Sequence, residues 1–127
     1  MTTRTIYNAN ETSAYAERCR LYRQRKSAVV ELKQYILIVN QGLEEAVWKT
    51  TQLFCRYTFT TKKGEKFRYI INKGAVCVLE KDVDITRNTV NVALSMVIDK
   101  GKLSETEWLR LYGGIYLEAI FERMGMG

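Results

Sequence analysis

The sequence predicts an α+β domain in which N-terminal helices precede a three-stranded antiparallel meander, and a C-terminal α-hairpin packs on one face of that sheet. Helical periodicity dominates residues 10–51, alternation of apolar and polar residues dominates residues 53–80, and helical patterns return over residues 85–124. Because 127 residues is close to the common size of one domain, residues 1–127 are expected to form a single domain. The second face of the sheet is expected to be covered by the N-terminal helix or by a second subunit.

The first helix is expected to begin near Asn10 or Thr12, because both side chains are good helix N-caps. An apolar stripe then follows at helical spacing and defines one face, made of Tyr15, Cys19, Tyr22, Val29, Leu32 and Ile36. This stripe predicts either one long helix or a helix that breaks near Ser27.

A second, short helix is predicted over residues 43–51, with Ala46 and Val47 facing inward, although a strand is the alternative there. Gly42 precedes it and is a candidate C-cap of the first helix, because glycine adopts the left-handed conformation that ends many helices.

A period of two predicts the strands. The first runs over residues 53–60, and Phe67, Tyr69 and Ile71 alternate along the second. The third strand is expected at residues 75–79, with turns at 62–65 and 72–74. Asp82 and Asp84 come between this strand and the next helix, where loop and cap roles are expected.

The last third of the chain is predicted to be helical. Residues 86–99 are apolar on nearly every side, which is typical of a buried helix. The final helix is expected to run from Ser104 to about Met124. Gly113-Gly114 interrupts it and suggests a kink or the close approach of another backbone.

The start of the final helix carries a strong local signal. Ser104 and Glu107 have the spacing of a capping box, in which each side chain bonds the backbone N–H of the other residue. Leu103 and Trp108 have the spacing of a hydrophobic staple across the same turn.

Composition excludes several classes of protein. The N-terminal residues are polar, and the longest apolar runs, 36–39 and 75–79, are too short to cross a bilayer. The chain has no His and no Pro, and its three cysteines have neither disulfide-framework nor zinc-site spacing. A cytoplasmic protein with no membrane association is therefore expected, with Cys19, Cys55 and Cys77 as free, small, buried apolar residues.

Catalytic interpretations are weak. Glu31 and Lys33 have the E-x-K spacing of some metal-dependent nucleases, but no Asp precedes them in the chain. Tyr22 beside arginines suggests a nucleophile for DNA strand transfer, yet no His is present to act as a base. The sequence therefore predicts a protein that is not an enzyme and has no catalytic residue, metal site or cofactor.

Charge is distributed unevenly, and this points to a polyanion. Residues 1–73 contain fourteen Lys and Arg and six Glu, whereas residues 74–127 contain six Lys and Arg and eight Asp and Glu. Two basic segments are candidate contacts for a polyanion: a stretch of the first helix that also contains tyrosine, and a predicted hairpin. Their candidate residues are Arg18, Arg20, Tyr22, Arg23, Arg25 and Lys26, and Lys62, Lys63, Lys66 and Arg68.

Each segment also has a simpler explanation. The tyrosines of the helix can face the core while the arginines only solubilise the surface, and lysines in edge strands also block edge-to-edge pairing. The leading hypothesis is a non-enzymatic nucleic-acid-binding accessory protein that binds a duplex with little sequence preference.

Two alternatives come from other functional classes. One is a small oligomeric interaction or inhibitor module whose basic face binds an acidic protein partner. The apolar helices over residues 90–98 and 108–121 offer a homodimer face for such a module. The other alternative is a binder of a small anionic ligand, for which Arg56 and Tyr57 on the predicted sheet are the best candidates.

Overall fold

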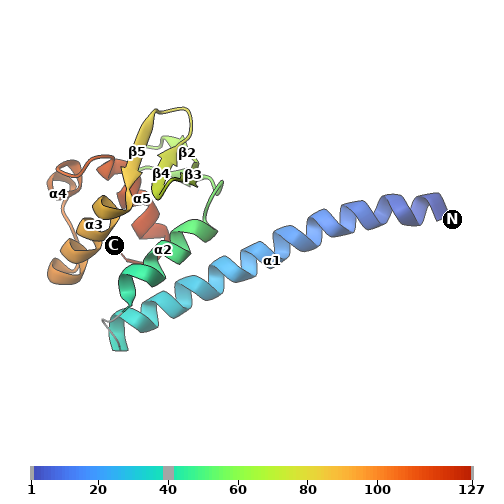
Figure 1. Cartoon of the computed structure of the whole chain (residues 1–127), viewed down its shortest axis with the longest axis horizontal. Coiled ribbons are helices and arrows are strands. Elements are labelled where there is room, and N and C mark those ends of the chain that lie inside the picture. Colours follow the sequence, from blue (N-terminus) through green and yellow to red (C-terminus); the bar gives the residue numbers. More distant parts are fainter. Residues whose placement is uncertain (1, 39–41, 127) are drawn as a thin grey trace.

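An N-terminal helix of 37 residues, α1 (Thr2–Ile38), forms one side of the structure. Figure 1 shows its C-terminal part lying beside the other elements, while its N-terminal part extends away from them. At 1.5 Å per residue, such a helix is about 55 Å long. The computed structural model describes residues 2–38 and 42–126, and it describes side chains at 14–34 and 42–126.

The predicted start of this helix is wrong. The helix begins at Thr2 rather than near Asn10 or Thr12, and it continues through Ser27 without a break. Asn and Thr are favoured at N-caps but do not force a helix to end, and residues 2–38 contain no Gly or Pro that would. The predicted long-helix alternative is therefore confirmed over its described residues.

The predicted inward face of α1 is also wrong in its N-terminal part. Tyr15 and Tyr22 are 63% and 60% exposed. The face that turns toward the rest of the molecule has the spacing i, i+4, i+7, i+11, and it carries Leu21, Arg25, Ala28 and the fully buried Leu32. Val29 is partly buried against the core, whereas the side chain of Ile36 lies outside the described residues.

The second helix, α2 (Leu43–Leu53), packs against α1 and confirms the predicted short helix. Val47 is fully buried and Ala46 is partly buried, as expected. Gly42 has the left-handed φ of 78°, but it serves as the N-cap of α2. Residues 39–41 lie outside the described residues, so the cap that ends α1 is not defined.

The strands form two small antiparallel sheets. One pairs β1 (Phe59–Thr60) with β2 (Lys66–Phe67). The other has the order β3-β4-β5, with β3 (Tyr69–Asn72), β4 (Ala75–Val78) and β5 (Val83–Thr86). The predicted turns at 62–65 and 72–74 connect these strands within each sheet.

Three strand predictions need correction. The predicted second strand is interrupted at Arg68, so Phe67 lies in β2 of one sheet while Tyr69 and Ile71 lie in β3 of the other. Residues 53–58 do not form a strand, because Leu53 ends α2, Phe54 caps it, and Arg56 takes a φ of 66° that turns the chain. The meander instead gains β5, a strand that lies in the segment where loop and cap roles were expected for Asp82 and Asp84. Asp82 lies in the preceding turn as expected, but Asp84 is a strand residue.

One face of the three-stranded sheet is in the core. Cross-strand partners Ile71, Val76 and Ile85 lie on this face, and the latter two are fully inaccessible. The opposite face carries Cys77 and the exposed Asp84. The expected cover of that face by the N-terminal helix is not observed in the described residues, because α1 packs against α2.

The helix α3 (Arg87–Lys100) is buried on one side only. Val90, Ala93, Leu94 and Val97 face the core. Because Val92 and Ile98 are 43% and 47% exposed, the prediction of a helix buried all round is wrong.

The predicted final helix is divided into α4 (Glu105–Leu109) and α5 (Gly114–Arg123). The capping box is confirmed: the Glu107 N–H donates to Ser104 Oγ over 3.2 Å, and the Ser104 N–H donates to Glu107 Oε1 over 3.0 Å. The close approach predicted at the glycines is confirmed as well. A Cβ on Gly114 would lie 1.7 Å from the Trp108 carbonyl oxygen, so only glycine fits there.

The predicted α+β class is therefore confirmed, with a three-stranded antiparallel sheet and a C-terminal helix pair. The helix α3 contacts β5, and α5 contacts β1. In the part of the chain that the structure describes, no helix has both the length and the apolar character needed to cross a bilayer.

Candidate nucleic-acid interface

The basic segment of α1 lies at the surface. Four of its cations have exposed side chains: Arg18, Arg20, Arg23 and Lys26. Tyr15 and Tyr22 are exposed, so they do not pack into the core as the simpler explanation requires. Aromatic and cationic groups are thus available together on one projecting helix.

Helical geometry divides these groups between two sides. Residues 15, 18, 22 and 26 follow the spacing i, i+3, i+7, i+11, which places Tyr15, Arg18, Tyr22 and Lys26 along one stripe. Arg20 and Arg23 lie on another side of the helix, and Arg20 is paired with Glu17 one turn earlier. Within the described residues, Arg18, Arg23 and Lys26 form no ion pair.

Arg25 has a different role from its neighbours. Its Nε donates to the Leu53 carbonyl over 2.7 Å, and its Nη2 donates to the Cys55 carbonyl over 3.1 Å. These carbonyls lie at the C-terminal end of α2, where a helix leaves acceptors without partners and carries partial negative charge. Arg25 therefore fastens α1 to α2. The clue in the sequence is that residue 25 lies seven residues before the buried Leu32 and shares its helix face.

Two of the four candidate cations of the predicted basic hairpin form ion pairs. Lys62 pairs with Glu118 over 3.1 Å, and Arg68 lies 4.0 Å from Glu80. Lys63 and Lys66 are exposed and form no ion pair among the described residues. Because β1 packs against α5 while α1 packs against α2, the two predicted basic segments are held by different parts of the fold.

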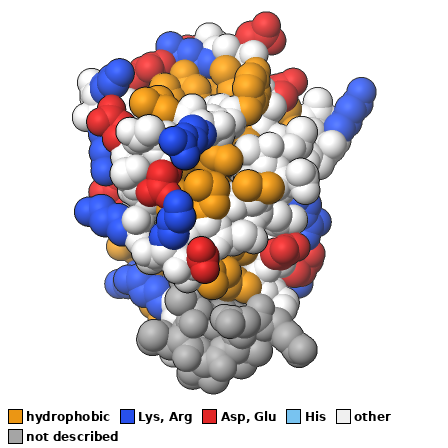
Figure 2. Space-filling model, turned by 90° about the vertical axis from the view of Figure 1, so that its left-hand side faces the viewer, with side chains coloured by type: hydrophobic (Ala, Val, Ile, Leu, Met, Phe, Trp, Pro, Cys, Tyr) orange, Lys and Arg blue, Asp and Glu red, His pale blue; other side chains and the backbone are white. Residues whose placement is uncertain are grey.

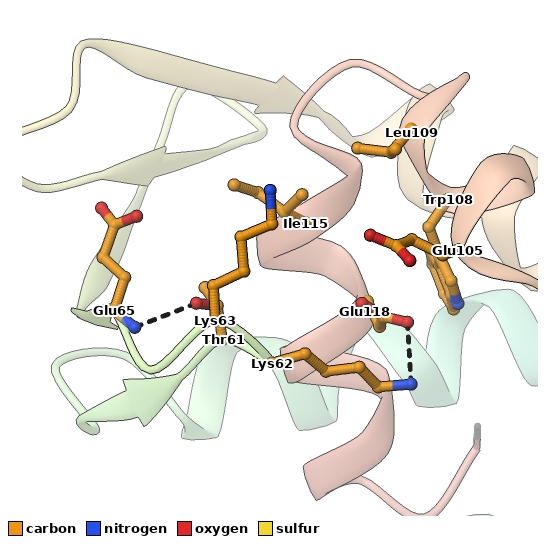
Figure 3. A pocket seen from close by; sticks show the side chains of 9 residues that line it. All are labelled: Thr61, Lys62, Lys63, Glu65, Glu105, Trp108, Leu109, Ile115 and Glu118. Atoms are coloured by element: carbon orange, nitrogen blue, oxygen red, sulfur yellow. Dashed lines mark hydrogen bonds and ion pairs between the residues drawn. The ribbon is translucent and has the colours of Figure 1, made fainter.

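A pocket of about 260 Å³ lies beside the hairpin (Figure 3). The loop between β1 and β2 faces α4 and α5 across it, and Trp108 and Ile115 supply apolar walls. Lys62 reaches across to Glu118, which is only 8% exposed, and this hydrogen bond raises the pKa of Lys62. Lys62 therefore neutralises a buried carboxylate of α5, which is a structural role.

The pair proposed for a small anionic ligand is not arranged as expected. Arg56 is exposed in a turn rather than on a strand, and its N–H bonds the Tyr69 carbonyl over 2.8 Å. Tyr57 is partly buried, and the guanidinium carbons of Arg25 and Arg123 each lie 5.4 Å from its ring centre. The arginines next to the Tyr57 ring are therefore Arg25 and Arg123, not Arg56. The alternation that predicted a strand over residues 53–60 gave no sign of these contacts, because both arginines come from other elements.

The face of the molecule away from the projecting helix carries charges of both signs (Figure 2). Figure 2 shows the end of the molecule opposite the projecting helix, where Lys and Arg are mixed with Asp and Glu around apolar side chains. The described residues contain no group of three or more His, Cys, Asp or Glu placed to hold a metal ion. All three cysteines are unpaired, as expected, but they are partly buried rather than buried.

The projecting face of α1 is therefore the best candidate for a functional surface in the described part of the molecule. Comparisons with protein-family models, with curated proteins and with solved structures found no match to this chain.

Proposed function

We propose that the protein is a non-enzymatic nucleic-acid-binding accessory protein that binds duplex DNA or RNA through the exposed face of α1. The observation that supports this most is the projecting helix itself, which carries exposed cations and the exposed Tyr15 and Tyr22 among its described side chains (Figure 1). The C-terminal part of α1 packs against α2, but its N-terminal part extends away from the other elements (Figure 1). A helical segment without tertiary packing gains little stability from its own propensity, so a ligand along it would stabilise it.

The charge of this segment favours an anionic ligand. Residues 14–34 contain six Lys and Arg but only two Glu. Cations that neutralise phosphates release condensed counterions, so binding is favourable at low salt and weakens steeply as salt rises. Contacts to phosphates carry no sequence information, which is why we expect little sequence preference. The hydroxyl and ring of Tyr15 and Tyr22 can add contacts to sugar or phosphate.

The test compares two triple variants of equal charge. Arg18, Arg23 and Lys26 are replaced by alanine in one, and the exposed Lys49, Lys102 and Arg110 are replaced in the control. Arg25 is left intact because it holds α1 to α2, and Arg20 because it is paired with Glu17.

Fluorescence anisotropy with a short labelled duplex over a range of salt concentrations gives the affinity and its salt slope. We expect the α1 variant to reduce that slope by about 2–3, because each lost phosphate contact removes about 0.9. The control should bind like the wild type. An absence of wild-type binding at low salt and micromolar protein, or equal losses in both variants, would show that α1 is not a nucleic-acid interface.

A protein-interaction module is the second candidate, and exposed apolar side chains favour it. Val92 and Ile98 of α3, together with Leu109 and Tyr112 near the end of α4, are 43–62% exposed. Such residues fit a homodimer or partner contact. Light scattering at increasing protein concentration tests the homodimer, and a constant monomer mass would exclude it. The three unpaired thiols fit a reducing compartment such as the cytoplasm.

A further inference from the structure

Two arginines from opposite ends of the chain converge on the same pair of aromatic rings. The guanidinium carbon of Arg25 lies 5.5 Å from the ring centre of Phe54 and 5.4 Å from that of Tyr57. The guanidinium carbon of Arg123, at the end of α5, lies 5.3 Å and 5.4 Å from the same two centres. The two rings meet edge to face with their centres 5.2 Å apart. This ring pair therefore makes cation–π contacts with both guanidinium groups.

Both arginines keep N–H groups for a further acceptor. Arg25 uses Nε and Nη2 for the carbonyls of Leu53 and Cys55. Arg123 uses Nε for the Tyr57 hydroxyl over 3.0 Å, and its Nη atoms have no acceptor among the described residues. A guanidinium carries five N–H donors in a fixed plane, so the terminal groups of Arg123 are oriented by the bond at Nε.

The charge of this pair is not neutralised within the described residues. No carboxylate lies within 4.0 Å of either guanidinium, whereas Arg87 pairs with Glu45 over 2.6 Å. Burial is the main cause that lowers the pKa of Arg25, and the charge of Arg123 acts weakly in the same direction, so the two cations repel each other. An anion between them would relieve this repulsion.

The pair is continuous with the exposed stripe of α1. Arg18, Tyr22 and Arg25 follow the spacing i, i+4, i+7, so they share one side of the helix. Arg18 and Arg25 are separated by about 10 Å along the helix axis. A phosphate chain that follows this side of α1 toward the body of the protein would therefore arrive at Arg25.

We propose that Arg25 and Arg123 form a binding site for a phosphate group, held by the terminal N–H groups of the two guanidiniums. Arginine is suited to this role because its planar fork donates two parallel hydrogen bonds to phosphate oxygens. The phosphate comes from a nucleic-acid backbone or from a small phosphorylated molecule. The first of these sources rests on the proposed function, and it makes the site the point where the bound strand reaches the body of the protein.

The surroundings of Arg123 are compatible with such a ligand. Arg123 lines a groove of about 550 Å³ between β1 and α5, together with Thr58 and Thr60, whose hydroxyls can donate to phosphate. Glu122 lines the same groove and disfavours an anion there. Replacing Glu122 by glutamine should therefore strengthen phosphate binding.

The experiment uses the full chain with Arg123→Gln and a matched control, Arg110→Gln. Both variants remove one exposed charge near the end of a C-terminal helix. The first measurement is the salt slope of binding to the short labelled duplex. The second is the change in melting temperature on adding millimolar inorganic phosphate in place of chloride at equal ionic strength.

We expect Arg123→Gln to lower the salt slope by about 0.9, the value for one phosphate contact, and to weaken binding severalfold, while Arg110→Gln has no effect. Phosphate should raise the melting temperature of the wild type and of Arg110→Gln, but not that of Arg123→Gln. If Arg123→Gln matches Arg110→Gln in both measurements while the wild type binds the duplex, the phosphate site is refuted and the proposed function stands.

The proposed function can also fail while the phosphate site stands. If the wild type binds no duplex but phosphate still stabilises it through Arg123, the site takes its phosphate from a small molecule and the proposed function is wrong. If phosphate also has no effect, both proposals are wrong. Should Arg123→Gln fail to fold, Arg123→Lys replaces it, because lysine keeps the charge but loses the two-pronged geometry. An unchanged phosphate response of Arg123→Lys would then refute the site.

Discussion

Replacing Arg25 by alanine should destabilise the fold far more than the same change at Arg23, two residues away. Arg25 donates to two carbonyls at 2.7 and 3.1 Å and lies over two aromatic rings. A hydrogen bond from a charged donor contributes about 1.5–3 kcal/mol, although water can reach carbonyls that are only partly covered. Taking the lower value for each bond, we expect a loss of about 2–3 kcal/mol for Arg25→Ala. Arg23 is exposed, so Arg23→Ala should change stability by less than about 0.5 kcal/mol.

Urea denaturation followed by tryptophan fluorescence measures both variants. The comparison is well controlled because both changes remove one arginine from one helix. Equal, near-neutral effects would refute the assignment of Arg25 as the residue that fastens α1 to α2. A large loss in both variants would instead show that the projecting face is packed, and the basis of the proposed interface would then be wrong.

Three further predictions concern the C-terminal helices and the thiols. Ser104→Ala should cost about 0.5–2 kcal/mol through the lost cap, and Trp108→Ala about 3–5 kcal/mol because Trp108 is only 3% exposed, as urea denaturation can show. Lys100 and the Ser104 backbone hold the pKa of Glu107 at about 2, below its ordinary value of 4.5. This group therefore stabilises the fold fully above about pH 4.5 and loses that effect as the pH falls toward 2, a dependence that Glu107→Gln should remove from a pH series of unfolding midpoints. Thiol counting under denaturing, non-reducing conditions should find all three cysteines free, and a protected pair would contradict a reducing compartment.

Local capping chemistry could be predicted from the sequence because it depends on neighbours along the chain. The bonds of Ser104 with Glu107 span one helical turn, and they formed as expected. The strand over residues 53–60 was predicted from alternation alone. There the aromatic side chains are buried for a different reason, since Phe54 caps α2 and Phe59 lies in a strand after the turn at Arg56. A helix end followed by a turn can imitate a period of two over so few residues.

The strand β5 shows the opposite error, because a real strand was not predicted. Val83 and Ile85 alternate with Asp84 and Thr86, and the burial of the four residues alternates in the same way. The signal was therefore present, but four residues are too few to distinguish a strand from a loop that leads into a helix cap. The pairing of residues 83–86 with β4 is what makes them a strand, and this pairing depends on the tertiary structure.

The roles of Arg18 and Arg25 show why the candidate interface could be predicted only in part. The two residues are seven positions apart and share one side of α1, so periodicity treats them alike. Arg25 bonds carbonyls at the end of α2, whereas Arg18 is exposed beyond the point where α1 passes that end. The position of that point depends on where α2 ends and how it packs on α1, neither of which is encoded in the residues of α1. A basic stripe on a helix therefore predicts which cations share a side, and the length of the neighbouring helix determines which of them hold the fold together and which remain available to a polyanion.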